Sequence, residues 1–136
     1  MRSLDTNVLA RFFVDDSDDA QADRQRPAAI AALSERAFVS VTVLLELEWV
    51  MRGFYEIPRH GAVRALRALA GIEHITIEDR DAVLAAVDAF EGGLDFADAL
   101  HLIRSARASA FATFDKKLAR CAKGLGLKPK IDLLSC

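Results

Sequence analysis

The first thirteen residues read MRSLDTNVLARFF (1–13), and they define how the fold begins. A polar triplet, Asp-Thr-Asn (5–7), stands where a predicted strand (2–4) gives way to a predicted helix (7–13). These residue types all favour the start of a helix, so helix capping is one explanation for the triplet. A metal site is the other explanation, because hard cations bind carboxylate oxygens. The rest of the sequence has to distinguish between them.

Short apolar runs alternate with longer amphipathic segments along the chain. The predicted strands lie at 2–4, 37–41, 74–77, 110–114 and 130–134. The predicted helices lie at 7–13, 24–36, 42–55, 58–72, 78–93, 95–109 and 115–126. Strands separated by helices indicate βαβ units, so we expect an α/β fold with a mainly parallel sheet. The length of 136 residues predicts a single domain, 1–136, that is large enough to bury a core.

Composition and charge exclude several classes of protein. A net charge of −2 argues against a general nucleic-acid coat protein, although basic residues gather in the last third of the chain. Two cysteines without a Cys-x-x-Cys pair argue against a disulfide scaffold or structural zinc. The sequence has no apolar run of about 18 residues that could span a membrane, and no secretory leader. We therefore expect a cytoplasmic protein with no membrane association.

Two aspartates follow predicted strands directly. Asp5 follows the strand 2–4, and Asp115 follows the strand 110–114. The carboxyl ends of parallel strands meet at one edge of a sheet, and ligands bind outside that edge. The two carboxylates are therefore expected at the same edge.

The helix predicted over 42–55 carries two glutamates. Its predicted core stripe consists of Val43, Leu47, Val50 and Phe54. Glu46 lies at the shoulder of this stripe, where its side chain can reach a cleft. Glu48 lies on the far side of the helix and is expected to face solvent. The helix is apolar nearly all round, which indicates burial against something extra, such as a second subunit.

The helix predicted over 95–109 begins with two aspartates. Asp95 and Asp98 are three residues apart, so they share one side of the helix near its N-terminus. Capping and a functional role explain Asp95 equally well. Asp98 lies one turn inside the helix, where capping no longer explains it.

Four separate segments thus supply carboxylates that could converge on one cleft: Asp5, Glu46, Asp98 and Asp115. Four clustered carboxylates repel one another, and a hard divalent cation such as Mg²⁺ or Mn²⁺ removes that cost. Such a site points to metal-assisted hydrolysis of a phosphodiester. Thr6, Asn7 and Thr113 are expected to support it by holding carboxylates or waters in place.

Four stretches of the chain together resemble the PIN domain family of ribonucleases, and in particular the VapC-type toxins of bacterial toxin–antitoxin pairs. They are LDTNVLARF (4–12), VTVLLELEWVMR (41–52), DFADALHLIRS (95–105) and ATFDKKLAR (112–120). The resemblance implies a three-layer sandwich in which helices flank a central, mainly parallel sheet. It also implies an endoribonuclease dependent on Mg²⁺ or Mn²⁺, a homodimer, and a cognate antitoxin that docks near the active site.

The resemblance carries the metal-binding roles onto Asp5, Glu46, Asp98 and Asp115. Asn7 and Thr113 match supporting polar positions, and Asp95 matches a frequent accessory acid.

Several basic residues are candidates for contacts with RNA phosphates. They are Arg64, Lys116, Lys117 and Arg120. A solvated surface explains any one of them equally well, but an acidic protein needs a local basic patch to hold an anion. Trp49 is typical of a core or an interface, and it would have to lie in an open groove to stack on a base.

Three other functions compete with the nuclease. A phosphotransfer enzyme of the haloacid type requires Asp-x-Asp after the first strand, and Asn7 breaks that motif. A serine or cysteine hydrolase lacks its Gly-x-Ser-x-Gly or Cys/His signature. A catalytically silent PIN-like binding or scaffold module remains as the alternative, although none of the four acids is missing.

Overall fold

The computed structural model describes residues 1–135, and these form two compact units. The first unit is Met1–Arg80, and the second begins at Asp81. Both combine helices with parallel strands, which confirms the predicted mainly parallel α/β fold. None of the helices within 1–135 has the length and apolar character needed to cross a membrane.

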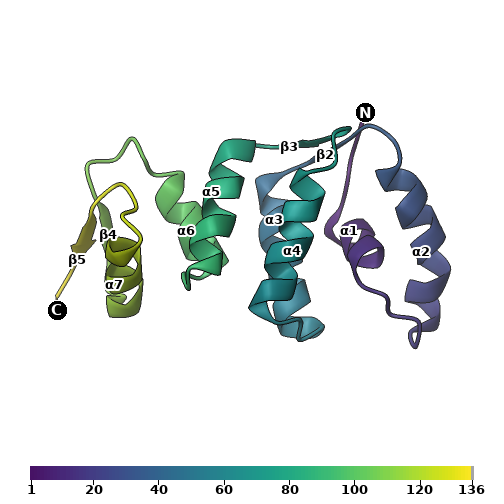
Figure 1. Cartoon of the computed structure of the whole chain (residues 1–136), viewed down its shortest axis with the longest axis horizontal. Coiled ribbons are helices and arrows are strands. Elements are labelled where there is room, and N and C mark those ends of the chain that lie inside the picture. The colour runs from purple at the N-terminus through teal and green to yellow at the C-terminus, as the bar shows by residue number, and fades with distance from the viewer. Residues whose placement is uncertain (136) are drawn as a thin grey trace. The chain divides into compact units, whose positions relative to one another are not determined.

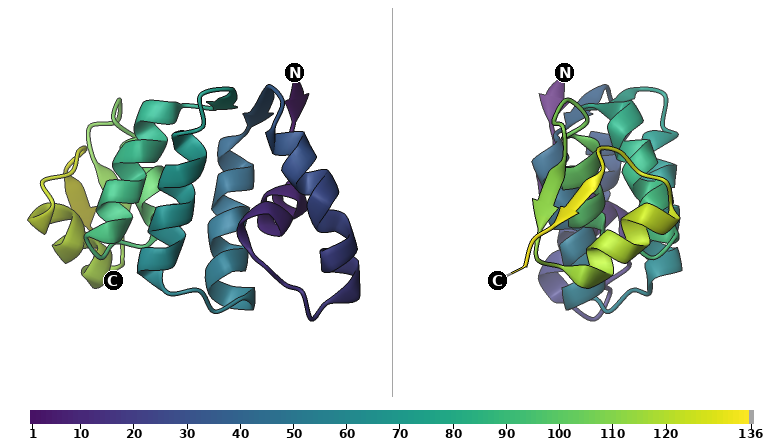
Figure 2. Two further views of the ribbon diagram at one scale, coloured as in Figure 1. Left: turned by 45° about the vertical axis from the view of Figure 1, so that its right-hand side comes forward. Right: turned by 90° about the vertical axis from the view of Figure 1, so that its left-hand side faces the viewer.

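The first unit contains a three-stranded parallel sheet in the order β1-β2-β3. Its elements are β1 (Arg2–Ser3), α1 (Thr6–Phe13), α2 (Ala20–Leu33), β2 (Ala37–Val39), α3 (Val41–Trp49), η1 (Val50–Phe54), α4 (Arg59–Ala70) and β3 (Ile75–Ile77). The η1 segment is a single π-helical turn that continues α3. Within this unit α1 lies between α2 and α3 (Figures 1 and 2).

Side-chain caps explain where the helices of the first unit begin. The Asp5 carboxylate accepts from the Thr6 amide at 2.8 Å, and the Asp19 carboxylate accepts from the Ala22 amide at 2.9 Å. These bonds satisfy backbone N–H groups that a helix leaves open in its first turn. Helix starts of this kind can be recognised from sequence because donor and acceptor are near neighbours in the chain.

The second unit contains a parallel pair of strands, β4 and β5. Its elements are α5 (Arg80–Glu91, whose first residue closes the first unit), α6 (Phe96–Ile103), β4 (Phe111–Thr113), α7 (Lys116–Gly124) and β5 (Ile131–Leu133). The rings of Phe90 and Phe96 pack 5.7 Å apart between α5 and α6. Gly93 ends the turn after α5 with a φ of 113°, a backbone conformation that would be strained for any residue type other than glycine. Helix α7 lies beside the strand pair (Figure 2, right).

The predicted face of α3 is wrong. The buried apolar residues of α3 and η1 are Val41, Leu44, Leu47 and Met51, and Phe54 is 71% exposed. Glu48 lies on this buried face with only 7% of its surface exposed, whereas it was expected in solvent. The reason is that α3 is apolar on nearly every side, so periodicity alone does not select the face that packs. Contacts with α1 and α4 select it.

Candidate active site

A pocket of about 360 Å³ in the first unit contains two of the predicted acids. Asp5, at the start of α1, and Glu46, on α3, both line it. One oxygen of Asp5, Oδ1, caps the helix through the Thr6 amide. Both residues are exposed, so their carboxylates can reach a ligand from solvent. The pocket brings together residues 41 positions apart in the chain, as the sequence analysis required.

Thr6 gives the pocket an unsatisfied polar atom. The residue is 6% exposed and lines the pocket, and its Oγ1 has no hydrogen-bond partner within residues 1–135. A buried hydroxyl without a partner costs about 1–3 kcal/mol relative to one that is satisfied. A water or a ligand atom in the pocket would remove that cost. Asn7 also lines the pocket, so both supporting residues predicted in the triplet lie beside Asp5.

Arg11, three aromatic residues and two small apolar ones, Ala10 and Val50, form the rest of the pocket wall. Arg11 donates from Nε to Gln25 Oε1 at 2.9 Å and from Nη1 to the Tyr55 hydroxyl at 3.1 Å. Trp49 and Phe54 also line the pocket. The sequence analysis missed Arg11 because its partners lie 14 and 44 residues away.

The second unit contains the other two predicted acids. Asp98 is half-buried in α6, and burial raises the pKa of its carboxyl above the ordinary value of 3.8. The negative charges of Asp95 and Asp115 raise this pKa further, and His101 lowers it. The surroundings of Asp98 are therefore unfavourable to its ionised form, first through burial and then through the two neighbouring carboxylates.

Capping explains part of the acidic set in this unit. Asp95 Oδ2 accepts from the Asp98 amide at 3.3 Å, and Asp115 Oδ1 accepts from the Leu118 amide at 3.0 Å. Thr113 Oγ1 accepts from the Asp115 amide at 3.0 Å, so Thr113 holds the backbone from which Asp115 projects. A cap bond uses one carboxylate oxygen and leaves the other available to a ligand.

The four predicted acids are thus distributed in pairs. Asp5 and Glu46 belong to the first unit, and Asp98 and Asp115 belong to the second. Within either unit, no three His, Cys, Asp or Glu side chains of the described chain gather in a group that could hold a metal ion. Each unit supplies half of the predicted ligand set.

The predicted RNA-contact residues are all exposed. Lys116 and Arg120 line a groove of about 1130 Å³ in the second unit, beside α7 and β5. Three further lysines line it, and sequence reasoning did not single them out: Lys123, Lys128 and Lys130. Lys117 is exposed on the same helix but outside the lining, and Arg64 is exposed on α4 of the first unit.

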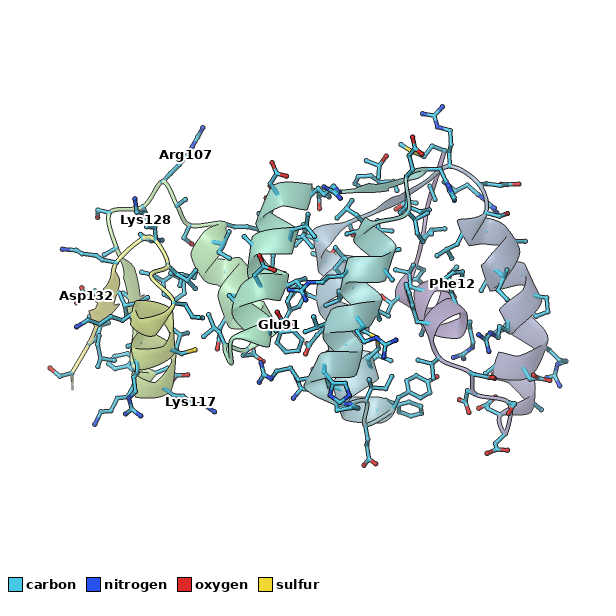
Figure 3. All side chains as sticks on the ribbon, in the orientation of Figure 1. Phe12, Glu91, Arg107, Lys117, Lys128 and Asp132 are labelled. Atoms are coloured by element: carbon cyan, nitrogen blue, oxygen red, sulfur yellow. The ribbon has the colours of Figure 1, made fainter. Side chains whose placement is uncertain are left out.

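This groove is strongly positive. No carboxylate belongs to its lining. Asp132 lies between Ile131 and Leu133, which line the groove, so strand alternation directs Asp132 to the opposite face of β5. Figure 3 shows Lys117 at the first turn of α7 and Lys128 beyond its last turn. The basic run in the last third of the sequence was the signal that could have located the groove.

Comparison with known proteins identifies the fold family. The family model for the PIN domain matches residues 3–124, a range that includes the four predicted acids and extends from the first unit into the second. Neither the curated proteins nor the solved structures gave a match. Because the matched range covers most of the 136 residues, this chain belongs to the PIN domain family.

Proposed function

We propose that this protein is an endoribonuclease that hydrolyses RNA phosphodiester bonds with the help of Mg²⁺ or Mn²⁺. PIN domains are typically nucleases, generally use divalent metal ions and generally bind RNA. The observation that carries the proposal is the pocket in which Asp5 and Glu46 meet beside the unsatisfied hydroxyl of Thr6. Two carboxylates and a hydroxyl are donors that suit a hard cation and its waters.

We propose Asp5, Glu46, Asp98 and Asp115 as the metal-binding acids of this nuclease, within a single domain over residues 1–136. The raised pKa of Asp98, caused first by burial and then by the charges of Asp95 and Asp115, supports its place in the set, because a nearby cation would favour the ionised carboxylate. When bound, a divalent cation supplies an activated water and neutralises charge on the phosphate.

The polar neighbours of these acids would orient them. Thr6 and Asn7 would position a water beside Asp5, and Thr113 would position Asp115 through its backbone amide. Asp95 would add negative charge next to Asp98 in addition to capping α6.

RNA would be held through its phosphates by basic side chains. The stretch of chain directly after Asp115 supplies Lys116, Lys117 and Arg120. Arg64 is exposed in the first unit. The lysine-lined groove beside α7 extends this positive surface. Phosphate contacts of this kind supply affinity without reading sequence.

The finer assignment rests on the resemblance to VapC-type toxins. We propose that the protein is the toxic component of a type II toxin–antitoxin pair in the cytoplasm, that it forms a homodimer, and that a cognate antitoxin restrains it. The four matching stretches of sequence support this proposal because they retain every acid of the family pattern.

The test is cleavage of a mixed pool of structured cellular RNAs by the purified protein. Reactions contain Mg²⁺, Mn²⁺ or EDTA, and a parallel series uses Asp5→Asn. We expect discrete fragments that require the metal and disappear in the variant. Cleavage that survives in EDTA or in Asp5→Asn would contradict the proposal. No cleavage together with no Mn²⁺ binding in calorimetry would favour the catalytically silent binding module, in which Asp5, Asp95 and Asp115 serve only as helix caps.

A further inference from the structure

Two large aromatic side chains are exposed at the pocket of Asp5 and Glu46. Trp49 is 70% exposed and Phe54 is 71% exposed, and both line the pocket. Trp and Phe contribute most to stability when they are buried, so two exposed rings at one pocket indicate a role in binding. Trp49 meets the condition set by the sequence analysis, which was that it lie in an open groove.

The ring of Phe54 is held by an ordered wall. Phe54 packs edge-to-face on Tyr55, with ring centroids 4.8 Å apart. The Tyr55 hydroxyl in turn accepts from Arg11, whose Nε donates to Gln25. The π-helical turn η1 carries Phe54 and links it directly to Trp49 at the end of α3. A wall fixed in this way loses little conformational entropy when a flat ligand binds.

The same pocket contains the guanidinium group of Arg11, which its hydrogen bonds orient and which still has unused N–H donors. Arg11 spends two of its five N–H donors on Gln25 and Tyr55, which leaves others for an anion. Thr6, whose buried Oγ1 has no hydrogen-bond partner within residues 1–135, also lines this pocket. The pocket therefore offers apolar flat surfaces, an oriented guanidinium and carboxylates within one lining.

We propose that Trp49 and Phe54 form a stacking platform for a base of single-stranded RNA, and that Arg11 contacts the phosphate beside that base. This inference rests on the proposed nuclease function and specifies its substrate: an unstacked nucleotide in a loop or a single strand. A nucleotide combines a flat aromatic base with an anion, and the pocket offers a complement to each. If this surface instead bound a protein partner, that partner would bury Trp49 in the absence of RNA.

The test uses the fluorescence of Trp49, which is the only tryptophan in the 136 residues. The protein is the Asp98→Asn variant in Mg²⁺, because this change lies outside the first unit and is expected to prevent cleavage of the probe. The probes are a single-stranded RNA of mixed sequence, the same strand in a duplex, and inorganic polyphosphate, which has charge without bases. A gel after each titration shows whether the RNA is intact.

We expect saturable quenching by the single strand, weaker quenching by the duplex and none by polyphosphate. Absence of quenching by the single strand overturns the proposal. Equal quenching by polyphosphate also overturns it, because the signal would then report charge alone. Emission that is blue-shifted without RNA and depends on protein concentration overturns it in favour of a protein–protein contact at Trp49.

Variants separate the platform from general effects on the fold. Trp49→Ala and Phe54→Ala are each expected to weaken RNA binding about 5- to 150-fold, which is the range for loss of one stacked base. Trp49→Phe keeps an aromatic ring at this position, so it is expected to retain most of the affinity for RNA that Trp49→Ala loses. Ile30→Ala is the matched control, because Ile30 is an exposed apolar residue of α2 outside this lining.

The outcomes for platform and nuclease are distinguishable. If wild-type protein cleaves RNA and Trp49→Ala cleaves and binds it equally well, the nuclease stands and the platform is overturned. If no RNA is cleaved but the single strand quenches Trp49, the platform stands and the nuclease is overturned.

Discussion

Two glutamates on α3, Glu46 and Glu48, have opposite surroundings and should give opposite phenotypes. Glu46 is exposed in the pocket with Asp5, whereas Glu48 is buried and pairs with Arg52 at 3.6 Å. We expect Glu46→Gln to lose metal-dependent cleavage with an unchanged free energy of unfolding. Glu48→Ala should keep cleavage but lose about 1–3 kcal/mol of stability, because it removes the buried partner of a half-buried arginine, Arg52. Urea unfolding and cleavage assays on both variants make the comparison; loss of cleavage by a fully folded Glu48 variant would contradict it.

Asp98 should make the metal-free protein sensitive to pH. Because burial and the charges of Asp95 and Asp115 raise its pKa, the folded state holds its proton to higher pH than the unfolded chain does. Stability therefore falls as pH rises from the ordinary value of 3.8 through the raised pKa. Asp98→Asn removes this penalty, so it should be more stable than wild type at pH 7 in EDTA.

Thermal unfolding across pH measures this effect. The stability gain of Asp98→Asn should vanish in acid, below the ordinary carboxyl range, where wild-type Asp98 is protonated in both states. Asp132→Asn, an exposed change on β5, is the control and should give a curve parallel to wild type. A gain that persists unchanged in acid would show that the charge of Asp98 is not its cause.

At the scale of elements, α7 and β5 form a positive groove whose role should appear as salt dependence. Lys123→Ala and Lys128→Ala each remove a lysine from its lining, and each should weaken RNA binding for every sequence. If each lysine meets one phosphate, the slope of log affinity against log salt should fall by about 0.7 per substitution. Fluorescence anisotropy with labelled RNA at several salt concentrations measures both quantities.

The control for the groove is Arg107→Ala, because Arg107 is exposed in the same unit but outside the lining (Figure 3). It should leave the salt slope close to that of wild type. A slope that falls as much in Arg107→Ala as in the lysine variants would mean that overall charge, rather than the groove, attracts RNA.

At the scale of the whole molecule, the four proposed metal-binding acids come in two pairs, one in each unit. Mn²⁺ at about 100 times its Kd should then stabilise wild-type protein by about 2.7 kcal/mol. Asp5→Asn in the first unit and Asp98→Asn in the second should each abolish most of this gain. Comparison of the double variant with the two single variants shows whether the two losses of stabilisation are additive.

Calorimetry and thermal unfolding with Mn²⁺ measure these gains. If each single variant keeps about half of the stabilisation and the double variant keeps none, the two units bind metal independently. That result would leave the two pairs of acids as separate centres, whereas a double variant that loses no more than either single variant would show that the acids act together.

Local interactions made much of this fold predictable. All the predicted helices and strands are present, but two helices differ from the prediction by a turn or more. Helix α2 begins at Ala20 rather than at residue 24, and α6 ends at Ile103 rather than at residue 109. Helix starts at Asp5, Asp95 and Asp115 could be predicted because each carboxylate bonds to a backbone amide at most three residues away. The alternation of strands and helices predicted parallel pairing, and the structure confirms it in β1-β2-β3 and in β4-β5.

The sequence by itself therefore determined the order of the elements and the positions of the acids on them. Only the tertiary structure decided which face of α3 is buried, because its apolar residues surround the helix and neighbouring helices select among them. Packing alone reversed the expected exposure of Glu48 and placed Trp49 and Phe54 in solvent. It also brought Arg11 to Tyr55 across 44 residues. Such contacts join distant parts of the chain, and no local pattern of residues encodes them.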